Sequence, residues 1–561
     1  MPPAPNRAEP AEPAEASAAT HPAPPPGGLD PKTAVVVIHG IGEQRPMETL
    51  RGFVRTTWQH DSGLFEGVDP RPDFNPWDVW SKPDHISGSA ELRRITTARA
   101  RAGSGAEGTR GRRFDFFEMH WADITADNTW GDFFDWFRAL LCRNPVKGDV
   151  PPRVQWLWCL LWVATITLVL SSAATAWLAW LKAGGPDLLA HTWLGAVLGW
   201  NCWPVIAAVV GLFSYGAKRV LTSFAGDVAR YVSAAPRNIR VRQEVRQRGL
   251  KLLRELTESN AYDRIILVGH SLGSVIAHDL VLLAWSEAAR ELRAPPGSEL
   301  HLAIRACERA ADELLDAAGY AKFDPGFERD DHACDCPIDR RVPDAAALRQ
   351  KRAAFRLAQR DLHRELAATR VRSPGGPAHA AWLISDLITL GSPLTHAEFL
   401  IARTLCELRL AVHTREMLRC PPMLEVLPDG AFGFAFHNPR DSKTLQPHFA
   451  AAMGAVRWTN ICDTSPPWAF LMGDLVSGPL TRDFGPGLVD IDIPMCRPKG
   501  ILATLGLARV FTHLMYWNDF SRTSRPLPPN EPVPEHIQAL RDALNYLDDP
   551  AAEQRLVARA V

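Results

Sequence analysis

A chain of 561 residues can hold one large α/β domain with insertions, or two to four domains of ordinary size. Its 62 Lys and Arg residues are balanced by 63 Asp and Glu residues and form no long basic block, which argues against nucleic acid as a partner. The ten cysteines are scattered and do not form the dense framework of a small secreted protein, so we expect reduced thiols in a cytosolic compartment.

The first 31 residues are mostly Ala, Pro and Glu. Such a composition cannot offset the entropy lost on ordering, so we expect a disordered tail without the apolar region of a signal peptide. The next segment, Thr33 to Gln44 ("TAVVVIHGIGEQ"), reads as a strand that ends at His39 and Gly40. A second strand is expected within Arg112 to Thr125.

Two long apolar runs follow, Val154 to Leu181 and Leu188 to Ser214. About 20 apolar residues suffice to cross a bilayer as a helix, and neither run shows the polar stripe of a core helix, so we expect a transmembrane hairpin. Tryptophans near both ends of the first run, among them Trp158 and Trp162, fit an interfacial belt. Positive charges flank the outer ends of the pair, which predicts that both outer ends, and the parts of the chain attached to them, face the cytoplasm.

The stretch "DRIILVGHSLGSVIAHDL" joins a β-branched apolar run, typical of a buried strand, to a run of helix formers. The G-x-S-x-G pattern lies at the corner between them, as in a nucleophile elbow. Gly269 and Gly273, on either side of His270 and Ser271, remove the Cβ atoms that would clash at this corner. Ser271 then projects from the tip, and the backbone N–H of Leu272 points at a developing oxyanion.

A serine nucleophile needs a histidine base and a carboxylate that orients the histidine, and after this kind of elbow the acid precedes the histidine. His513 is the candidate base, because the only other histidine after the last expected strand is His536 in a polar tail. Asp463, at the end of the strand in "WTNICD", and Asp474, in the next loop, are both candidates for the acid. The acidic residues of "LVDIDI" alternate with apolar ones and read as the polar face of a strand.

The motifs "VVVIHGIGEQ", "FEMHWAD", "ILVGHSLGSVIAHD", "LITLGSPL", "RWTNICD", "GDLVSGPL" and "THLMYWND" together resemble the lipase/esterase-like branch of the α/β-hydrolase superfamily, in particular its bacterial membrane-associated members. The likeness covers most of the chain from Thr33 to Asn518. It implies that His39 and Gly40 belong to an oxyanion loop and that the following amide, that of Ile41, is the second oxyanion donor.

The same resemblance implies which carboxylate is the acid. In such relatives the acid lies in a segment like "GDLVSGPL", which points to Asp474. Leu475 stands where a proline is common, and this departure keeps Asp463 as the alternative. The family's H-x-x-Y-W pattern falls on His513.

The expected function is hydrolysis of an acyl ester through a triad of Ser271, His513 and Asp474 and an acyl-enzyme, with no metal and no organic cofactor. Anchoring in a membrane, the bacterial inner membrane by the resemblance, favours a lipid ester, with thioesters and acylated proteins as further substrates. The alternative is a catalytically silent hydrolase fold that acts as a membrane-anchored interaction module. The sequence leaves the oligomeric state open.

The expected fold is an α/β-hydrolase fold, a mostly parallel sheet with helices on both faces, interrupted by insertions. The insertion after the elbow helix is either a lid over the site or a passive surface helix pair. The expected segments are a disordered tail (1–31), the first part of the hydrolase domain (32–150), the transmembrane hairpin (154–214), the part with the elbow (220–293), the helical insertion (294–379), the part with the acid and histidine (380–525), and a polar helical tail (526–561).

Overall fold

The computed structural model describes residues 32–40, 45–65, 78–86, 91–101, 111–125, 140–146, 236–320, 344–369, 382–402, 404–428, 430–438, 441–464, 476–493, 512–517 and 533–560, with some further single residues and short pieces, among them Asp474. All of them belong to one compact unit, residues 31–561. Ile41, Leu475 and the expected disordered tail lie outside the described residues.

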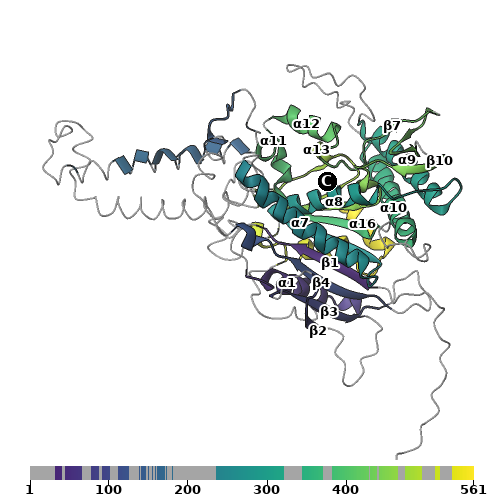
Figure 1. The fold of residues 1–561 in the computed structure, drawn as a ribbon. Helices are drawn as coiled ribbons and strands as arrows, with labels where there is room; N and C mark the ends of the chain where they lie inside the picture. Colours follow the sequence, from purple (N-terminus) through teal and green to yellow (C-terminus); the bar gives the residue numbers. More distant parts are fainter. Residues whose placement is uncertain are drawn as a thin grey trace, which may run out of the picture. The chain divides into compact units, whose positions relative to one another are not determined.

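An eight-stranded sheet runs through this unit in the order β12-β11-β6-β5-β1-β4-β3-β2 (Figure 1). Strands β4, β1, β5, β6, β11 and β12 are parallel to one another. Strand β3 is antiparallel to both of its neighbours, β4 and β2. The predicted α/β class with a mostly parallel sheet is therefore confirmed. The strands are β1 Lys32–Ile38, β2 Val79–Pro83, β3 Arg93–Arg99, β4 Arg113–Met119, β5 Arg264–His270, β6 Ile384–Leu390, β11 Arg457–Cys462 and β12 Val489–Asp492.

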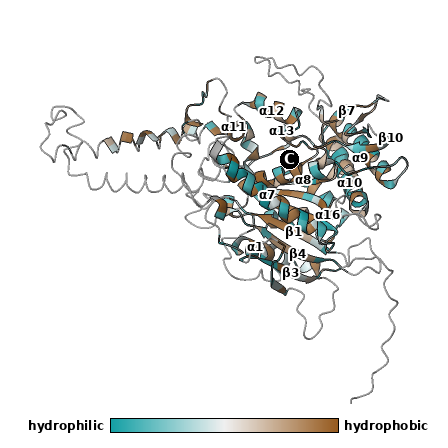
Figure 2. Cartoon of the chain, viewed as in Figure 1, coloured by the Kyte–Doolittle hydropathy of each residue, from teal (hydrophilic) through white to brown (hydrophobic). Residues whose placement is uncertain are grey.

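Helices cover both faces of the sheet, because its central strands are apolar on both sides. Val36 and Leu267 face a core cluster with α7, α8, α9 and α10, whereas Val37 and Val268 face a second cluster with α1, α15 and α16. Figure 2 shows apolar residues along the central strands and a mixture of polar and apolar residues on α7. These helices are α1 Glu48–Val54, α7 Pro236–Glu258, α8 Leu272–Ala288, α9 Glu299–Ala318, α10 Ala345–Ala368, α15 Glu535–Leu544 and α16 Pro550–Arg559.

A group of smaller elements lies between β6 and β12 in the chain. They comprise three short helices and two small antiparallel sheets, β9 with β10 and β7 with β8. Their bounds are α11 Ala397–Leu400, α12 Leu405–His413, α13 Thr481–Phe484, β7 Glu425–Val426, β8 Phe432–Gly433, β9 Ala435–Asn438 and β10 Asp441–Pro447.

Two segments expected at the surface contribute to the core instead. In the insertion, α10 buries Phe355, Leu362 and Leu366 in the first cluster. In the expected polar tail, α15 buries Leu540 and Leu544 in the second cluster. Both segments are amphipathic helices. Their many charged residues made the sequence look like a surface segment, although each helix also has an apolar stripe that faces the sheet.

A buried cluster of charged side chains ties these helices to the amino ends of the parallel strands. Arg264 and Arg457, the first residues of β5 and β11, contact Asp386 of β6 at 2.6 and 2.9 Å. Glu553 of α16 accepts from Arg457 at 3.4 Å and pairs with Arg356 of α10. Helix α10 of the insertion is therefore anchored at the edge of the sheet opposite to the end of β5 where Ser271 lies.

The expectation of a transmembrane hairpin, and with it of an integral protein of the bacterial inner membrane with two spans, is wrong. Among the residues that the structure describes, no helix has both the length and the apolar character needed to cross a bilayer. The tryptophans read as an interfacial belt bind their own chain: Trp158 and Trp162 donate their indole N–H groups to the carbonyls of Leu140 and Leu141, at 3.2 and 3.1 Å. Residues 188–214 lie outside the described part of the chain.

The expectation of reduced cysteines needs one correction. Cys406 on α12 is disulfide-bonded, whereas Cys142, Cys159, Cys307, Cys420 and Cys462 are free. Scattered spacing carried no signal for this bond, because a bridge outside a dense cysteine framework leaves no spacing pattern.

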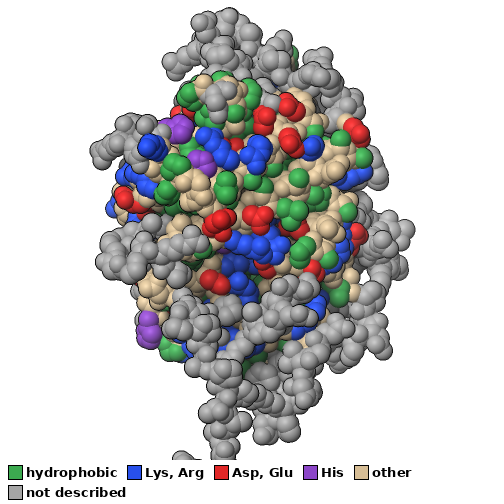
Figure 3. Space-filling model, turned by 90° about the vertical axis from the view of Figure 1, so that its right-hand side faces the viewer, with side chains coloured by type: hydrophobic (Ala, Val, Ile, Leu, Met, Phe, Trp, Pro, Cys, Tyr) green, Lys and Arg blue, Asp and Glu red, His purple; other side chains and the backbone are tan. Residues whose placement is uncertain are grey.

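Charged side chains of both signs are interspersed on the face that Figure 3 presents. On α9 and α10 they form exposed pairs, such as Lys351 with Glu313 at 2.8 Å. Exposed pairs of this kind contribute little to stability, because water screens them and two long side chains must be ordered. They contrast with the buried cluster around Asp386.

We expect Asp386→Asn to lower the free energy of unfolding by about 3 to 5 kcal/mol, because Arg264 and Arg457 would keep buried charges without their carboxylate. The matched control is Glu313→Gln, which removes the exposed partner of Lys351 and should change stability by less than about 1 kcal/mol. Chemical denaturation followed by tryptophan fluorescence measures both. Equal effects of the two substitutions would contradict the assignment of the cluster as a buried anchor.

Candidate active site

The predicted site residues lie near the carboxyl ends of β1 and β5, where the chain switches from one half of the sheet to the other. Strands β1 and β5 are neighbours, but β2, β3 and β4, which lie between them in the chain, are all on the far side of β1, whereas the later strands β6, β11 and β12 are on the far side of β5. In parallel sheets such a switch leaves a crevice outside the carboxyl ends of the two strands. The segment His39 and Gly40 follows β1, and Ser271 follows β5, so both lie at this crevice.

Ser271 occupies a strained corner between β5 and α8. Its φ of 53° and ψ of −129° are unusual for a residue with a side chain, and such strain persists only where the surroundings enforce it. Its N–H donates to the carbonyl of Leu390 at 2.9 Å, and the residue is 2% exposed. His270, the last residue of β5, turns its ring toward His513, with ring centroids 5.0 Å apart.

The glycines beside this corner permit close backbone contacts. A Cβ on Gly269 would lie 2.5 Å from the Cα of Ser274, and a Cβ on Gly273 would lie 2.3 Å from the carbonyl oxygen of Ile38. Gly273 therefore lets α8 begin directly against the end of β1. Leu272 is the first residue of α8, where backbone N–H groups have no acceptor within the helix.

Asp474 and His513 are brought together by the structure. The Nδ1 of His513 lies 2.9 Å from Oδ2 of Asp474, which also accepts the Tyr516 hydroxyl at 2.7 Å, and Oδ1 accepts the Val476 amide at 2.9 Å. Burial alone would raise the pKa of Asp474, but the charge and hydrogen bond of His513 and the bond from Tyr516 lower it to about 2. Asp474 is therefore an ionised, fully buried acceptor that faces the histidine.

Asp463, the alternative acid, has a different role. Its backbone carbonyl accepts the N–H of Asp474 at 3.0 Å, and its Oδ2 accepts the amide of Met495 at 3.3 Å. Asp463 thus connects the loops after β11 and β12. Of the two candidates, Asp474 is the one bonded to His513.

The loop after β6 joins the serine side of the site to the histidine side. Leu390, whose carbonyl accepts the Ser271 amide, is followed by Gly391 with φ of 59°. A Cβ on Gly391 would lie 3.1 Å from Nδ1 of His513 and 3.0 Å from Oδ2 of Asp474. A residue with a side chain would therefore both strain this turn and crowd the pair.

The segment after β1 is held by a tryptophan of the "HWAD" motif. His39 donates from Nδ1 to the carbonyl of Gly40 at 2.8 Å, and its Nε2 accepts the amide of Trp121 at 3.2 Å. The two rings stack with centroids 5.2 Å apart, and burial lowers the pKa of His39 to about 4. His39 is therefore a neutral structural ring, and it leaves Gly40 so close to the serine that a Cβ there would lie 2.7 Å from Cβ of Ser271.

Sequence reasoning missed two features of the site. Tyr516, noted only as part of a motif, is a direct donor to Asp474. Asp490, read as the polar face of a strand, is 1% exposed and accepts the amides of Leu480 and Thr481 at 2.9 and 2.7 Å. It fixes the loop between the acid and β12. The distance of nine or ten residues between Asp490 and these amides carries no distinctive sequence signal, although a carboxylate inside an apolar strand indicates a buried polar partner.

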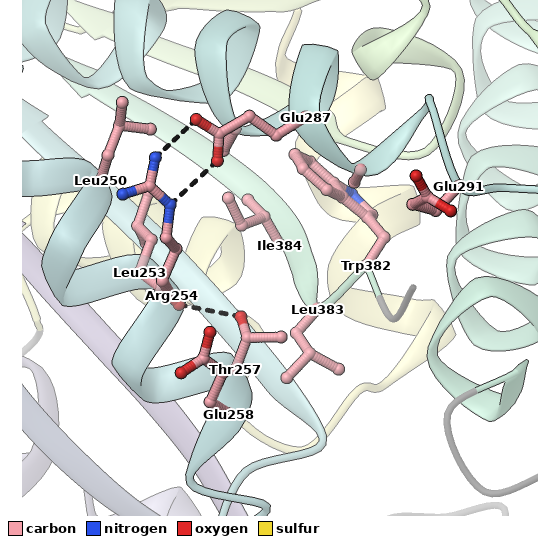
Figure 4. A pocket seen from close by; sticks show the side chains of 12 residues that line it. Leu250, Leu253, Arg254, Thr257, Glu258, Glu287, Glu291, Trp382, Leu383 and Ile384 are labelled. Atoms are coloured by element: carbon pink, nitrogen blue, oxygen red, sulfur yellow. Dashed lines mark hydrogen bonds and ion pairs between the residues drawn. The ribbon is translucent and has the colours of Figure 1, made fainter. Parts of the chain in front are cut away.

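A pocket of about 240 Å³ lies elsewhere, between α7, α8 and the start of β6 (Figure 4). Trp382 and Ile384 form part of its lining, and Arg254 pairs with Glu287 through two hydrogen bonds of 3.0 and 2.6 Å beside it. Ile384 begins β6, so this pocket is at the amino edge of the sheet, away from Ser271. Within the described ranges, no three His, Cys, Asp or Glu side chains are placed to hold a metal ion.

No model of a known protein family matches the chain, and no curated protein or solved structure shows a significant similarity to it. The family resemblance thus depends on the motifs alone.

We expect Gly391→Ala to lower reactivity at Ser271 in addition to the loss of stability that its left-handed backbone alone would cause. The control is Gly297→Ala, because Gly297 also has a positive φ, 74°, but a Cβ there meets no atom within 4 Å. Both substitutions should cost about 1 to 2 kcal/mol of stability for the left-handed backbone. Only Gly391→Ala should also move Asp474 and His513 apart and lower reactivity at Ser271 by about 100-fold. Equal reactivity of the two variants would contradict the crowding.

Asp474 should make stability depend on pH. Its pKa is about 2 in the folded chain against an ordinary value of 3.8, so the folded state binds this proton more weakly. The resulting contribution, about 2 kcal/mol, is fully present above about pH 4 and is lost as the pH falls toward 2. Denaturation of wild type and Asp474→Asn between pH 6 and pH 3 should show a stability gap that narrows at the acid end. A gap independent of pH would contradict the ionised carboxylate.

Proposed function

We propose that this protein is a serine ester hydrolase with an α/β-hydrolase fold, in which Ser271 is the nucleophile, His513 the base and Asp474 the acid. The observation that carries the proposal is the 2.9 Å contact between Asp474 and the Nδ1 of His513, next to a serine in a strained strand-to-helix corner. The fold assignment is supported by the order Ser271, Asp474, His513 along the chain and by their positions at the carboxyl edge of the parallel sheet.

The hydrogen bonds of His513 define its chemical role. Because Asp474 is ionised and can only accept, Nδ1 of His513 carries the proton, which leaves Nε2 as the basic nitrogen. Nε2 takes the proton of the Ser271 hydroxyl as its oxygen attacks an acyl carbonyl, and then gives it to the leaving group. Water hydrolyses the resulting acyl-enzyme by the same steps in reverse. Asp474 stabilises the imidazolium that forms in each step.

The oxyanion of the tetrahedral intermediate would be bound by backbone amides. Leu272 supplies the first, because it lies at the N-terminus of α8 where N–H groups and the helix dipole favour negative charge. The amide of Ile41 remains the prediction for the second. Removal of such a donor typically costs about 3 to 4 kcal/mol of transition-state stabilisation.

The substrate class is an acyl ester or thioester. The sequence-based preference for a lipid ester rested on the membrane hairpin and lost that support. A silent hydrolase fold has no need for an ionised Asp474 aligned with His513 beside a strained serine, so the catalytic proposal is preferred.

The test is labelling of the purified protein by a fluorophosphonate probe, with hydrolysis of a short-chain p-nitrophenyl ester measured in parallel. Ser271→Ala should abolish labelling, and His513→Ala should slow it by a factor of at least about 1000. Asp474→Asn should reduce the rate by up to about 10,000-fold, because His513 would lose its tautomer, whereas Asp463→Asn, the matched control, should leave most of the reactivity.

Three outcomes would contradict the proposal in whole or in part. Labelling that persists in Ser271→Ala would place the nucleophile elsewhere. If folded wild-type protein is neither labelled by the probe nor able to hydrolyse esters, the alternative of a catalytically silent interaction module would be favoured. A larger loss in Asp463→Asn than in Asp474→Asn would exchange the roles of the two acids.

A further inference from the structure

His270 lies between the candidate nucleophile and the candidate base. Its backbone leads directly into Ser271, and its Nε2 lies 2.7 Å from the main-chain carbonyl oxygen of His513. Its ring also packs against Trp517, with centroids 4.8 Å apart and planes at 78°. On its other side, a Cβ on Gly40 would lie 3.2 Å from Nδ1.

The chemistry of this contact fixes the state of the His270 ring. A carbonyl oxygen can only accept, so Nε2 of His270 must carry a proton. Burial, followed by the neighbouring His513, lowers the pKa of His270 to about 3, so the ring is neutral and Nδ1 is unprotonated near neutral pH. His270 is therefore a neutral donor that adds no second positive charge beside the base.

The contact also determines how the turn with His513 is attached. Thr512–Leu514 form a single 3₁₀ turn, which has little internal hydrogen bonding of its own. Hydrogen bonds between residues 513–517 and the rest of the chain include those of His270 with the His513 carbonyl, of His513 and Tyr516 with Asp474, of Tyr516 with Ser477, and of Thr56 with the Trp517 carbonyl. Among these bonds, the one from His270 comes from β5, the strand that leads into Ser271.

We propose that His270 is a positioning residue, whose Nε2–H bond to the His513 carbonyl sets the height of the His513 imidazole relative to the Ser271 hydroxyl. This inference rests on the proposed function, because it assigns His270 to the same reaction. Asp474 fixes the tilt and tautomer of the His513 ring, and His270 fixes the backbone from which that ring projects. A misplacement of the base by about 1 Å can cost roughly 100-fold in rate.

The test compares His270→Gln with His270→Asn. The side-chain amide N–H of Gln can reach the position of the imidazole Nε2–H, whereas that of Asn is one methylene shorter, so the two variants share chemistry but differ in reach. His270→Leu removes the donor. We expect His270→Gln to retain most of the rate of ester hydrolysis, and His270→Asn and His270→Leu to lower kcat by about 10- to 100-fold with little change in KM.

The outcomes separate this inference from the proposed function. Thermal unfolding of each variant shows whether the fold is retained, and the Gln variant serves if the Leu variant does not fold. Wild-type labelling at Ser271 with equal kcat for the Gln and Asn variants would overturn the role of His270 and leave the hydrolase proposal intact. An effect on KM alone would also overturn it. Absence of labelling in folded wild type would overturn both.

Discussion

The backbone turn at Ser271 is the constraint on which the rest of the site depends. A φ of 53° at a residue with a side chain costs free energy, so neighbouring elements must hold it. The Leu390 carbonyl accepts the Ser271 amide, and Gly273 lets α8 press against the end of β1. These contacts bring together the ends of three parallel strands. Once they are in place, the loop after β6 presents Gly391, and the space that its missing Cβ leaves is occupied by Tyr516, Asp474 and His513.

The two edges of the sheet use charge in different ways. At the carboxyl edge, the ionised carboxylate of Asp474 is bonded to His513, and burial keeps His39 and His270 neutral. At the amino edge, Arg264, Asp386 and Arg457 form a dense buried cluster that reaches α10 and α16. The second arrangement suits an anchor, because every charge has a partner at hydrogen-bonding distance. The first suits chemistry, because a single negative charge can define one tautomer of one ring.

The features that could be predicted from the sequence are those formed by residues close together in the chain. The strand, glycines and helix around Ser271 are adjacent, so their pattern indicated the corner, and the apolar strands indicated the parallel sheet. The choice between Asp463 and Asp474 could not be made from spacing, because a loop places its carboxylates by contacts with β12 that no short motif records. The same limit hid Tyr516 as a donor and Asp386 as the centre of an ion cluster, since each partner lies far away in the chain. Apolar length predicted a membrane span after Val154, and this prediction could not include the bonds of Trp158 and Trp162 to the carbonyls of Leu140 and Leu141, which precede the run.

The bond between His270 and the His513 carbonyl joins residues 243 positions apart, which has a consequence for the order of events during synthesis. The strand and the serine leave the ribosome first, while the acid and the base follow near the end of the described chain. At a translation rate of about 5 to 20 residues per second, Ser271 is exposed for roughly 10 to 50 s without the groups proposed to activate it. During synthesis, the proposed triad is incomplete until His513 has been added. Reactivity at Ser271 would begin only when the residues after 512 have folded back onto the sheet.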